Sequence, residues 1–255
     1  MQVKNRVVII SGGASGLGEA CSRLFVESGA KVGILDLNKE KGKDLVSDLG
    51  SAAVFQATDV GDEQSVHTAV GEIAKTFEAV HVAINCAGVI NAAKIYSKGV
   101  LFPMKLFNQA IRINLLGTMH IIRAAVKEMM KNEPDENEER GVIVNCSSGA
   151  AFLGQIGQAA YSASKAGVIG LTLPIAREIG DYGMRIVTIA PGIFETPMSA
   201  GIPESIKQGI SEQIPFPKRF GRPQEFAMMA RHIVENSYLN GTTIMLDGAA
   251  RLPAK

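Results

Sequence analysis

Short apolar runs alternate with longer segments of helical periodicity along the whole chain. The runs are nearly continuous in Val, Ile, Leu and Ala and do not alternate apolar with polar residues. This pattern is typical of parallel strands that are buried on both faces of a sheet. It predicts strands at Val7–Ile10, Lys31–Asp36, Ala53–Asp59, Val82–Asn85, Val142–Cys146, Arg185–Ala190 and Thr243–Leu246.

The segments between these strands space their apolar residues as amphipathic helices do. Strands and helices in alternation predict βαβ units, and no linker or repeat interrupts them. We therefore expect one domain over residues 1–255, an α/β Rossmann fold with a doubly wound, seven-stranded parallel sheet and helices on both faces. Helices are predicted at Glu19–Ser28, Glu63–Phe77, Asn108–Lys131 and Ser162–Gly180.

Two connections are longer than a minimal βαβ unit needs. Asn91–Leu106 follows the fourth predicted strand, and Thr196–Arg222 follows the sixth. Because long loops in a compact domain are usually functional, we expect residues 91–106 and 196–222 to be substrate loops. The acidic run Asn132–Arg140 is predicted to be a solvated surface loop with no further role.

Composition and charge narrow the classes of partner. Hydrophobic residues make up 46% of the chain and its formal net charge is +1, so a nucleic-acid partner is not expected. Three separated cysteines without a Cys-x-x-Cys pair predict free thiols. No apolar run matches a membrane span or a signal-peptide core, so we expect no membrane partner and a cytoplasmic protein, with the mitochondrial matrix as the alternative. The histidines lack metal-ligand spacing, and no metal is expected.

A glycine-rich loop, Ser11 to Gly18, connects the first predicted strand to the first helix. Gly12, Gly16 and Gly18 permit a tight turn and let the backbone approach a pyrophosphate closely. The free amides and the dipole of the following helix then stabilise the phosphate charge. Turns are often rich in glycine, so the loop alone is a weak indication of a dinucleotide site.

An acidic residue at the end of the second strand strengthens this prediction. Asp36 lies 24 residues after Gly12, where a carboxylate can accept hydrogen bonds from the adenosine ribose hydroxyls. It would also repel a 2′-phosphate, and positions 13–15 and 37 hold no Arg to attract one. The sequence therefore predicts NAD over NADP. Asp59, at the end of the third predicted strand, is either a contact at the adenine edge or an ordinary strand-end residue.

Tyr161 and Lys165 lie four residues apart at the start of a predicted helix, which places both side chains on one face. An isolated phenol gives up its proton only near pH ~10. A neighbouring ammonium, together with a positive nicotinamide, would stabilise the phenolate and allow proton exchange nearer neutrality. Since a lone Tyr-x-x-x-Lys pair usually marks only a helix surface, it needs support from elsewhere.

Polar residues at two strand ends supply that support. Ser148 follows the fifth predicted strand, 13 residues before Tyr161. Its hydroxyl is therefore expected at the carboxyl edge of the sheet, where ligands bind in such folds. Asn85 to Gly88 ends the fourth strand at the same edge. An asparagine in an apolar run either ties the backbone together or belongs to the site.

In their order along the chain, these features resemble the short-chain dehydrogenase/reductase family over essentially its whole length. Ser11 stands where the family usually has threonine, which preserves the hydroxyl. The resemblance rests on Gly12-x-x-x-Gly16-x-Gly18, Asn85-x-Ala-Gly88, Asn114, Ser148, Tyr161-x-x-x-Lys165 and Pro191-Gly192.

The resemblance implies a role for each catalytic residue. Tyr161 would be the general acid and base, and Ser148 would hold the substrate oxygen. Lys165 would stabilise the phenolate and bind the nicotinamide ribose, and Asn114 would support a water-mediated proton relay. Thr196 would contact the carboxamide. The implied NAD site consists of Ser11, Gly12, Ser15, Gly16, Leu17, Gly18, Asp36, Asp59, Val60, Asn85, Ala87, Gly88, Tyr161, Lys165, Pro191, Gly192, Ile193 and Thr196.

Stretches outside this shared set, such as RIVTIAPGIFETP and LNGTTIMLDGAAR, resemble one subfamily, type 2 3-hydroxyacyl-CoA dehydrogenase, also called 17β-hydroxysteroid dehydrogenase type 10. That resemblance implies (S)-3-hydroxyacyl-CoA and 3-oxoacyl-CoA as the substrate pair. It also implies a homotetramer, with Leu246–Leu252 at a subunit contact. Two features on the substrate side depart from the subfamily. Glu195 stands where a glycine is expected, and the amino-acid sequence of Asn91–Leu106 differs.

An acyl-CoA site needs an apolar channel with cations at its mouth. Ser148, Gln155, Gln158 and Tyr161 are the predicted substrate-binding residues, and Phe152 and Leu153 are further candidates for the channel. The cations of the two long loops either meet the CoA phosphates or are ordinary solvated charges. They are Lys94, Lys98, Lys105, Lys207, Lys218, Arg219 and Arg222.

Three functions are therefore weighed. The first is hydride transfer on a 3-hydroxyacyl-CoA, and the second is oxidation of a steroid or another secondary alcohol. The third is a non-catalytic scaffold or RNA-processing partner. Intact Ser148, Tyr161 and Lys165 favour catalysis, and the near-neutral charge does not favour an RNA role.

Overall fold

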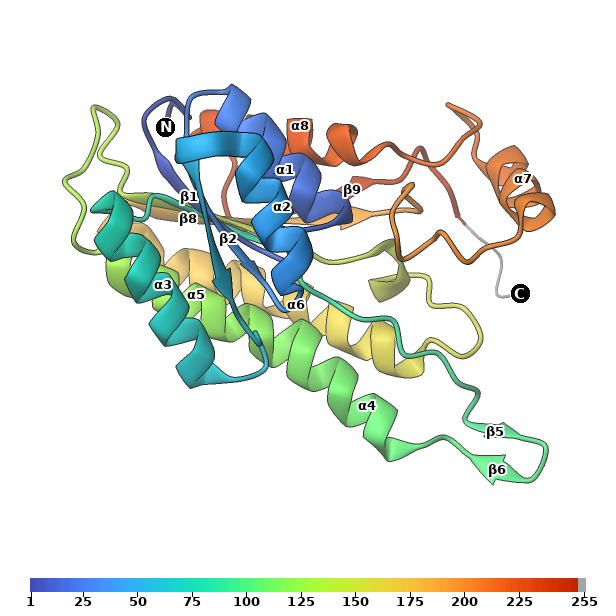
Figure 1. The fold of residues 1–255 in the computed structure, drawn as a ribbon. Helices are drawn as coiled ribbons and strands as arrows, with labels where there is room; N and C mark the ends of the chain where they lie inside the picture. The colour runs from blue at the N-terminus through green and yellow to red at the C-terminus, as the bar shows by residue number, and fades with distance from the viewer. Residues whose placement is uncertain (252–255) are drawn as a thin grey trace.

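A seven-stranded parallel sheet forms the centre of the computed structural model, which describes residues 1–251 (Figure 1). Its strand order, β3-β2-β1-β4-β7-β8-β9, runs outward in both directions from β1 and β4. This is the predicted doubly wound Rossmann topology. The strands are β1 (Val7–Ser11), β2 (Lys31–Asp36), β3 (Ala53–Ala57), β4 (Val82–Asn85), β7 (Gly141–Cys146), β8 (Met184–Pro191) and β9 (Thr243–Leu246).

Every predicted strand is present, and the central ones are buried along their whole length. All residues of β1, β4, β7 and β8 are buried, as expected for runs covered on both faces. The main difference is at β3, which ends at Ala57 and not at Asp59. There the Asp59 carboxylate accepts a hydrogen bond from the Gly61 amide at 2.8 Å, which turns the chain toward the next helix.

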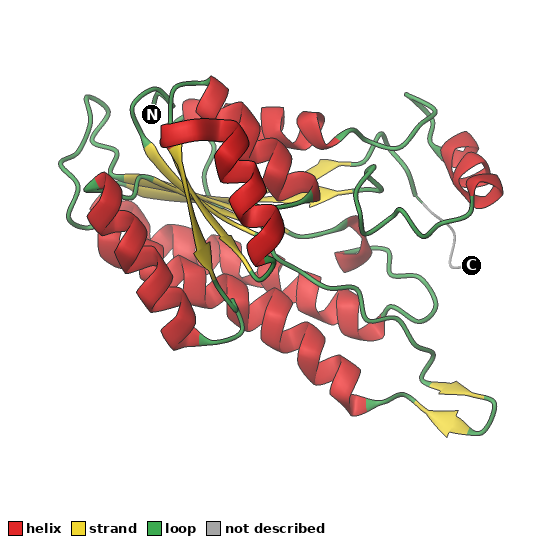
Figure 2. Cartoon of the chain, viewed as in Figure 1, coloured by secondary structure: helices red, strands yellow, loops and turns green. Residues whose placement is uncertain are grey.

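Helices cover both faces of the sheet (Figure 2). The core on one face includes Phe25 and Phe226, and the core on the other includes Ile73 and Ile121. The first face carries α1 (Gly16–Glu27), α2 (Lys39–Leu49) and α8 (Pro223–Glu235), and the second carries α3 (Glu63–Phe77), α5 (Gly117–Met129) and α6 (Ala159–Ile179). No helix within residues 1–251 is both long enough and apolar enough to span a bilayer.

The two long connections contain regular structure that the apolar pattern did not show. Residues 91–106 form a protruding hairpin of β5 (Tyr96–Ser97) and β6 (Val100–Leu101). Helix α4 (Met104–Ala110) begins inside the same segment. Residues 196–222 contain α7 (Glu204–Gln213), which has no buried residue. Strands of two residues and a helix without a buried face leave no periodicity to read.

The predicted helix Asn108–Lys131 is a continuous run of three pieces. Helix α4 leads into a π-helix over Ile111–Leu116, which leads into α5. A π-helical turn inside an α-helix often occurs at a functional site. Here it contains Asn114, whose side chain is fully buried.

The acidic run 132–140 is more than a solvated loop, and that prediction was wrong for two of its residues. Glu139 is 6% exposed and forms ion pairs with Arg185 and with the Met1 amino group. The Asn132 side chain donates to the Val80 carbonyl at 2.7 Å. All three partners are distant in sequence, so the local acidity of the run could not reveal them.

Candidate active site

A cavity of about 860 Å³ opens at the carboxyl ends of the central strands. Its volume lies within the range of roughly 300–1,000 Å³ that is usual for small-molecule sites, and its position is the one expected for a doubly wound sheet. The predicted site residues that line it are Gly12, Ser15, Gly16, Leu17, Gly18, Asp36, Asp59, Val60, Ala87, Gly88, Ser148, Gln155, Gln158, Tyr161, Lys165, Pro191, Gly192, Ile193 and Thr196.

The glycine loop needs its glycines for space as well as for conformation. A Cβ on Gly12 would lie 2.8 Å from the Ala87 Cα, and a Cβ on Gly18 would lie 2.1 Å from the Gly12 carbonyl oxygen. Gly12 and Gly16 also have φ values of +65° and +56°, which L side chains rarely adopt. The loop thus presents bare backbone and the start of α1 to the cavity, as a pyrophosphate requires.

The Asp36 carboxylate is held in place by two backbone amides. The Ala14 amide donates to Oδ2 at 3.1 Å, and the Asn38 amide donates to Oδ1 at 2.9 Å. Each oxygen keeps a lone pair for a further donor. Asp36 lines the cavity, so the carboxylate can accept hydrogen bonds from ribose hydroxyls.

Asp59 is engaged within the protein on both oxygens. The Gly61 amide donates to one at 2.8 Å, and the Arg112 guanidinium donates to the other at 3.1 Å. Asp59 nevertheless lines the cavity. These contacts favour the strand-end role that the sequence left open, and the adenine contact stays a prediction.

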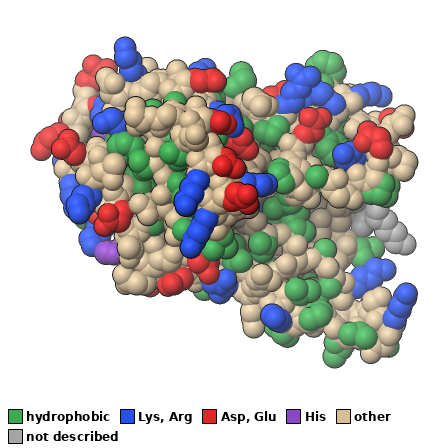
Figure 3. Space-filling model, in the orientation of Figure 1, with side chains coloured by type: hydrophobic (Ala, Val, Ile, Leu, Met, Phe, Trp, Pro, Cys, Tyr) green, Lys and Arg blue, Asp and Glu red, His purple; other side chains and the backbone are tan. Residues whose placement is uncertain are grey.

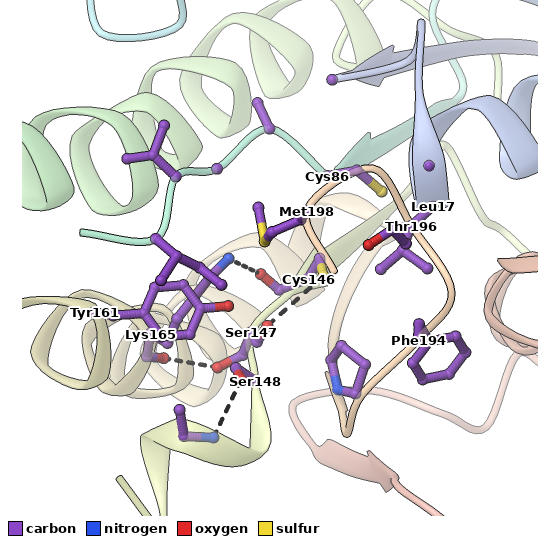
Figure 4. Close-up of a pocket in the computed structure, with 18 of the residues that line it drawn as sticks. Leu17, Cys86, Cys146, Ser147, Ser148, Tyr161, Lys165, Phe194, Thr196 and Met198 are labelled. Carbon is purple, nitrogen blue, oxygen red and sulfur yellow. Dashed lines mark hydrogen bonds between the residues drawn. The ribbon is translucent and has the colours of Figure 1, made fainter. Parts of the chain in front are cut away.

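Tyr161 and Lys165 lie on one face of α6, and both are nearly buried, at 9% and 4% exposed. The Lys165 ammonium donates to the Cys146 carbonyl at 2.8 Å and lies 5.9 Å from the centre of the Tyr161 ring (Figure 4). This anchor at the end of β7 fixes the ammonium close to the phenol. A positive charge at that place stabilises a phenolate.

Two neighbouring serines at the end of β7 have different tasks. The Ser147 hydroxyl donates to the Lys165 carbonyl at 2.8 Å and ties the strand to α6. The Ser148 hydroxyl accepts from the Ala150 amide at 3.1 Å. Because that contact uses only a lone pair, the Ser148 hydroxyl hydrogen remains available to a substrate oxygen.

Asn114 supports the site from behind and does not line the cavity. Its Oδ1 accepts from the Val89 amide at 2.8 Å, and its Nδ2 donates to the Ser164 hydroxyl at 2.9 Å. Ser164 in turn donates to the Tyr161 carbonyl at 2.7 Å. The side chain of Asn114 therefore positions the helix that carries Tyr161, while the predicted water relay stays a prediction.

Two residues of the implied NAD site are not on the cavity wall. Ser11 and Asn85 are 2% and 3% exposed, and their side chains face each other at 3.4 Å. Asn85 also donates to the Asn145 side chain at 2.9 Å. Both lie in strands, whose alternation turns these side chains into the layer between sheet and helices. In this structure the two side chains pair with other strands, and a direct contact with NAD stays a prediction for them.

The substrate side of the cavity agrees only in part with the prediction. Gln155 and Gln158 line it and are joined by a hydrogen bond from the Gln155 amide to Gln158 Oε1 at 3.1 Å. Leu153 lines it as well, whereas Phe152 is 53% exposed and does not. The 3-10 turn at Gly149–Ala151 places Phe152 on the outside.

None of the seven candidate cations lines the main cavity. Arg219 is paired with Glu225 at 2.7 Å, and Lys207 is paired with Glu204 at 3.7 Å. Lys94 lines a smaller neighbouring cavity of about 500 Å³, which also includes Gln155. Apolar and lysine side chains gather on the protruding hairpin (Figure 3).

Several apolar residues of the cavity wall were not predicted. They come from loops, helix faces and strands, where one more hydrophobic residue is no indication of a site. These are Cys86, Val89, Ile90, Ile113, Cys146, Phe194, Met198, Ile202, Ile210 and Met245.

The two wall cysteines are free thiols, as predicted. Burial raises the pKa of Cys146 to about 12. A hydrogen bond with Cys21, together with burial, raises the pKa of Cys86 well above its usual value. Both thiols stay protonated at neutral pH and so act as apolar wall groups, not as nucleophiles.

Comparison with known proteins identifies the family that has this active-site geometry. The family model described as short chain dehydrogenase matches residues 6–207. The chain belongs to the short-chain dehydrogenase family. As a member, it is an oxidoreductase with a nicotinamide cofactor, NAD or NADP, and the glycine loop and Asp36 provide fitting contacts for the dinucleotide.

Two relatives and one solved structure, each at more than 40% identity and matching over nearly their whole length, share one name. The chain is 46% identical over 252 residues to 3-hydroxyacyl-CoA dehydrogenase type-2 of Homo sapiens, covering 98% of this chain and 97% of that protein. It is 45% identical to the Drosophila melanogaster protein of the same name, covering 98% and 99%. The crystal structure of 3-hydroxyacyl-CoA dehydrogenase type-2 from Mycobacterium avium is 41% identical with a TM-score of 0.94, covering 100% of this chain and 98% of that one.

Proposed function

We propose that this chain is an NAD-dependent dehydrogenase that interconverts (S)-3-hydroxyacyl-CoA and 3-oxoacyl-CoA. The observation that carries the proposal is the presence of Tyr161, Lys165, Ser148 and Asp36 around one cavity. The substrate class is supported by the names of the two relatives at 45–46% identity and of the similar solved structure.

Electrostatics at Asp36 supports the choice of NAD. Its carboxylate is held toward the cavity by the amides of Ala14 and Asn38. A 2′-phosphate beside it would meet like charge, and the next residue, Leu37, is an exposed apolar side chain that offers no compensating cation. Ribose hydroxyls instead find two acceptor oxygens there.

The residues of the chain divide the work of the reaction. When bound, the nicotinamide accepts a hydride from the alcohol carbon or delivers one to the ketone carbon. Tyr161 transfers the accompanying proton at the substrate oxygen, and Ser148 donates a hydrogen bond to that oxygen. Lys165, anchored by the Cys146 carbonyl, stabilises the phenolate that remains when Tyr161 has given up its proton.

Apart from the glycine loop, the walls of the cavity suit the acyl chain of an acyl-CoA better than they suit the phosphates of its CoA group. Among the lining residues within 1–251, Lys165 is the one basic side chain. The CoA phosphates would then lie outside the cavity, where Lys94, which lines the neighbouring smaller cavity together with Gln155, is a candidate contact. The same apolar lining favours a second candidate function, oxidation of a steroid or another secondary alcohol. Intact catalytic residues weigh against a purely non-catalytic scaffold.

A substrate panel tests the acyl-CoA assignment. Purified protein and NADH are mixed with acetoacetyl-CoA, with free acetoacetate and with a ketosteroid, and NADH absorbance is followed. The proposal expects the highest kcat/KM with acetoacetyl-CoA. Equal values with and without the CoA group, or a clear preference for the steroid, would reject the acyl-CoA assignment and leave the dehydrogenase standing.

The assignment of the proton to Tyr161 has its own test. Replacing Tyr161→Phe should lower kcat by at least about 100-fold, since general acid-base catalysis contributes 10²–10⁴-fold. NADH affinity, measured by fluorescence titration, should stay close to that of the wild type. Retained turnover in the variant would reject the mechanism.

The homotetramer also belongs to this proposal. Strand β9 is the edge of the sheet and its residues are only partly buried, which is typical of an edge that another element covers. The stretch expected at the subunit contact, 246–252, ends on a residue outside those described. Light scattering on the purified protein measures the assembly directly, and a monomer would reject it.

A further inference from the structure

Four polar residues, one on each of four neighbouring strands, form a row across the centre of the apolar sheet. Ser11, Asn85, Asn145 and Thr188 are direct neighbours on β1, β4, β7 and β8. All are 3% exposed or less. Neighbours in register point to the same face of a sheet, and the contact of Thr188 with Thr172 of α6 identifies that face. Buried polar groups of this kind require hydrogen-bond partners.

The first half of this row is joined by direct hydrogen bonds. The Ala87 amide donates to the Ser11 hydroxyl at 3.4 Å, and Ser11 donates to Asn85 Oδ1 at 3.4 Å. Asn85 Nδ2 then donates to Asn145 Oδ1 at 2.9 Å. This orientation of the Asn145 amide leaves its Nδ2 pointing away from Asn85, and Nδ2 has no partner within residues 1–251.

The other end of the row leaves an acceptor unused. The hydroxyls of Thr188 and Thr172 lie 2.6 Å apart, and Thr172 donates its one hydrogen to the Val168 carbonyl at 3.1 Å. The hydrogen between the two threonines therefore comes from Thr188. The lone pairs of the Thr188 oxygen remain free for a further donor, and Thr188 is the register neighbour of Asn145 on the next strand.

We propose that one internal water joins Asn145 Nδ2 to the Thr188 hydroxyl and that Asn145 is a positioning residue of the active site. The water accepts from the amide and donates to the threonine oxygen, which gives a partner to Asn145 Nδ2, the side-chain atom of the row that lacks one within residues 1–251. Internal waters occupy such places in proteins, on the order of one per 27 residues.

The completed row connects the two halves of the active site. At one end, Ser11 is the last residue of β1 and the first of the glycine loop. At the other end, Thr172 lies two turns along α6 from Lys165. Asn145 is also the residue before Cys146, whose carbonyl holds the Lys165 ammonium. The inference rests on the proposed dehydrogenase function, because the role given to Asn145 is to keep the cofactor loop and the catalytic helix α6 at the right distance from each other.

The experiment compares two single variants, their combination and a control. Asn145→Leu removes the donor together with the acceptor of Asn85 Nδ2. Thr188→Val removes the acceptor together with the hydrogen given to Thr172, with little change of shape. The control, Asn132→Leu, removes another buried asparagine, which donates to the carbonyls of Val80 and Arg140 away from the cavity. For each protein, kcat, KM, the Kd of NADH and the free energy of unfolding are measured.

Each row variant should lower kcat on the order of tenfold, the equivalent of about 1.4 kcal/mol, with the Kd of NADH within about threefold. The double variant should be no slower than about the worse single one, since both break the same bridge. The control should lose stability and keep kcat. A high-resolution crystal structure of the wild type should show a water between Asn145 Nδ2 and the Thr188 oxygen.

Three results would overturn the inference. They are an unchanged kcat in Thr188→Val, a fully additive loss in the double variant, or no water density between the two atoms. The kinetics use any ketone that the wild type reduces. A wild type that rejects acetoacetyl-CoA but reduces another ketone therefore refutes the proposed substrate and leaves this test intact.

Discussion

His81 ties the amino-terminal ends of three strands together, and it gives the stability of the fold a defined dependence on pH. Its Nδ1 accepts a hydrogen bond from the Val7 amide at 3.1 Å. Its backbone donates to the Val7 carbonyl at 2.8 Å and accepts from the Val142 amide at 2.9 Å. Burial, followed by the charge of Arg6, lowers the pKa of His81 from 6.5 to about 4.

The sign and size of the effect follow from proton linkage. The folded protein binds the His81 proton more weakly than the unfolded chain does. The stabilising contribution is therefore complete above pH 6.5 and is lost as the pH falls from 6.5 toward 4. Between about pH 7.5 and about pH 5, these pKa values remove about 2 kcal/mol from the free energy of unfolding. Solvent screening of a partly buried ring reduces this to roughly 1 kcal/mol.

The assay is denaturant unfolding at both pH values for the wild type and for His81→Gln, whose side chain does not titrate. Carboxylates and the other histidines contribute equally to both proteins and cancel in the comparison. The wild type should lose roughly 1 kcal/mol more than the variant on acidification. Parallel losses in the two proteins would show that the His81 ring is free to take up its proton in the folded state.

Three further predictions concern the active site. Gly18→Ala places a Cβ 2.1 Å from the Gly12 carbonyl oxygen and should raise the Kd of NADH at least ~10-fold by titration, an effect of about 1.4 kcal/mol. Its control is Gly170→Ala in the middle of α6, where an added Cβ would have no atom within 4 Å. This variant should keep NADH affinity and stabilise the fold by up to about 1 kcal/mol. Asp36→Ala should reduce the kcat/KM preference for NADH over NADPH at least ~10-fold, because the repulsion of a 2′-phosphate is removed; an unchanged ratio would reject the role of that carboxylate. Lys165→Met should lower kcat about 100-fold, because the anchored ammonium that stabilises the phenolate is lost, and an unchanged kcat would contradict its role.

Much of the fold and the catalytic centre could be predicted from the sequence because the features that define them are local. Continuous apolar runs mark strands that are covered on both faces, wherever those strands end up in the sheet. A spacing of four places Tyr161 and Lys165 on one helix face regardless of what surrounds the helix. The glycines of the loop and Asp36 at a strand end are tied to the βαβ unit itself.

The tertiary structure decided whatever depends on partners distant in sequence. Asn85 reads the same in the sequence whether it faces a cofactor or Asn145, and only the sheet register places it in the buried row. Glu139 looks like one more acid in a polar run until Arg185 is beside it. The apolar wall and the order of the strands are set in the same way. They are fixed by packing between segments, and a single sequence carries no local signal for such contacts.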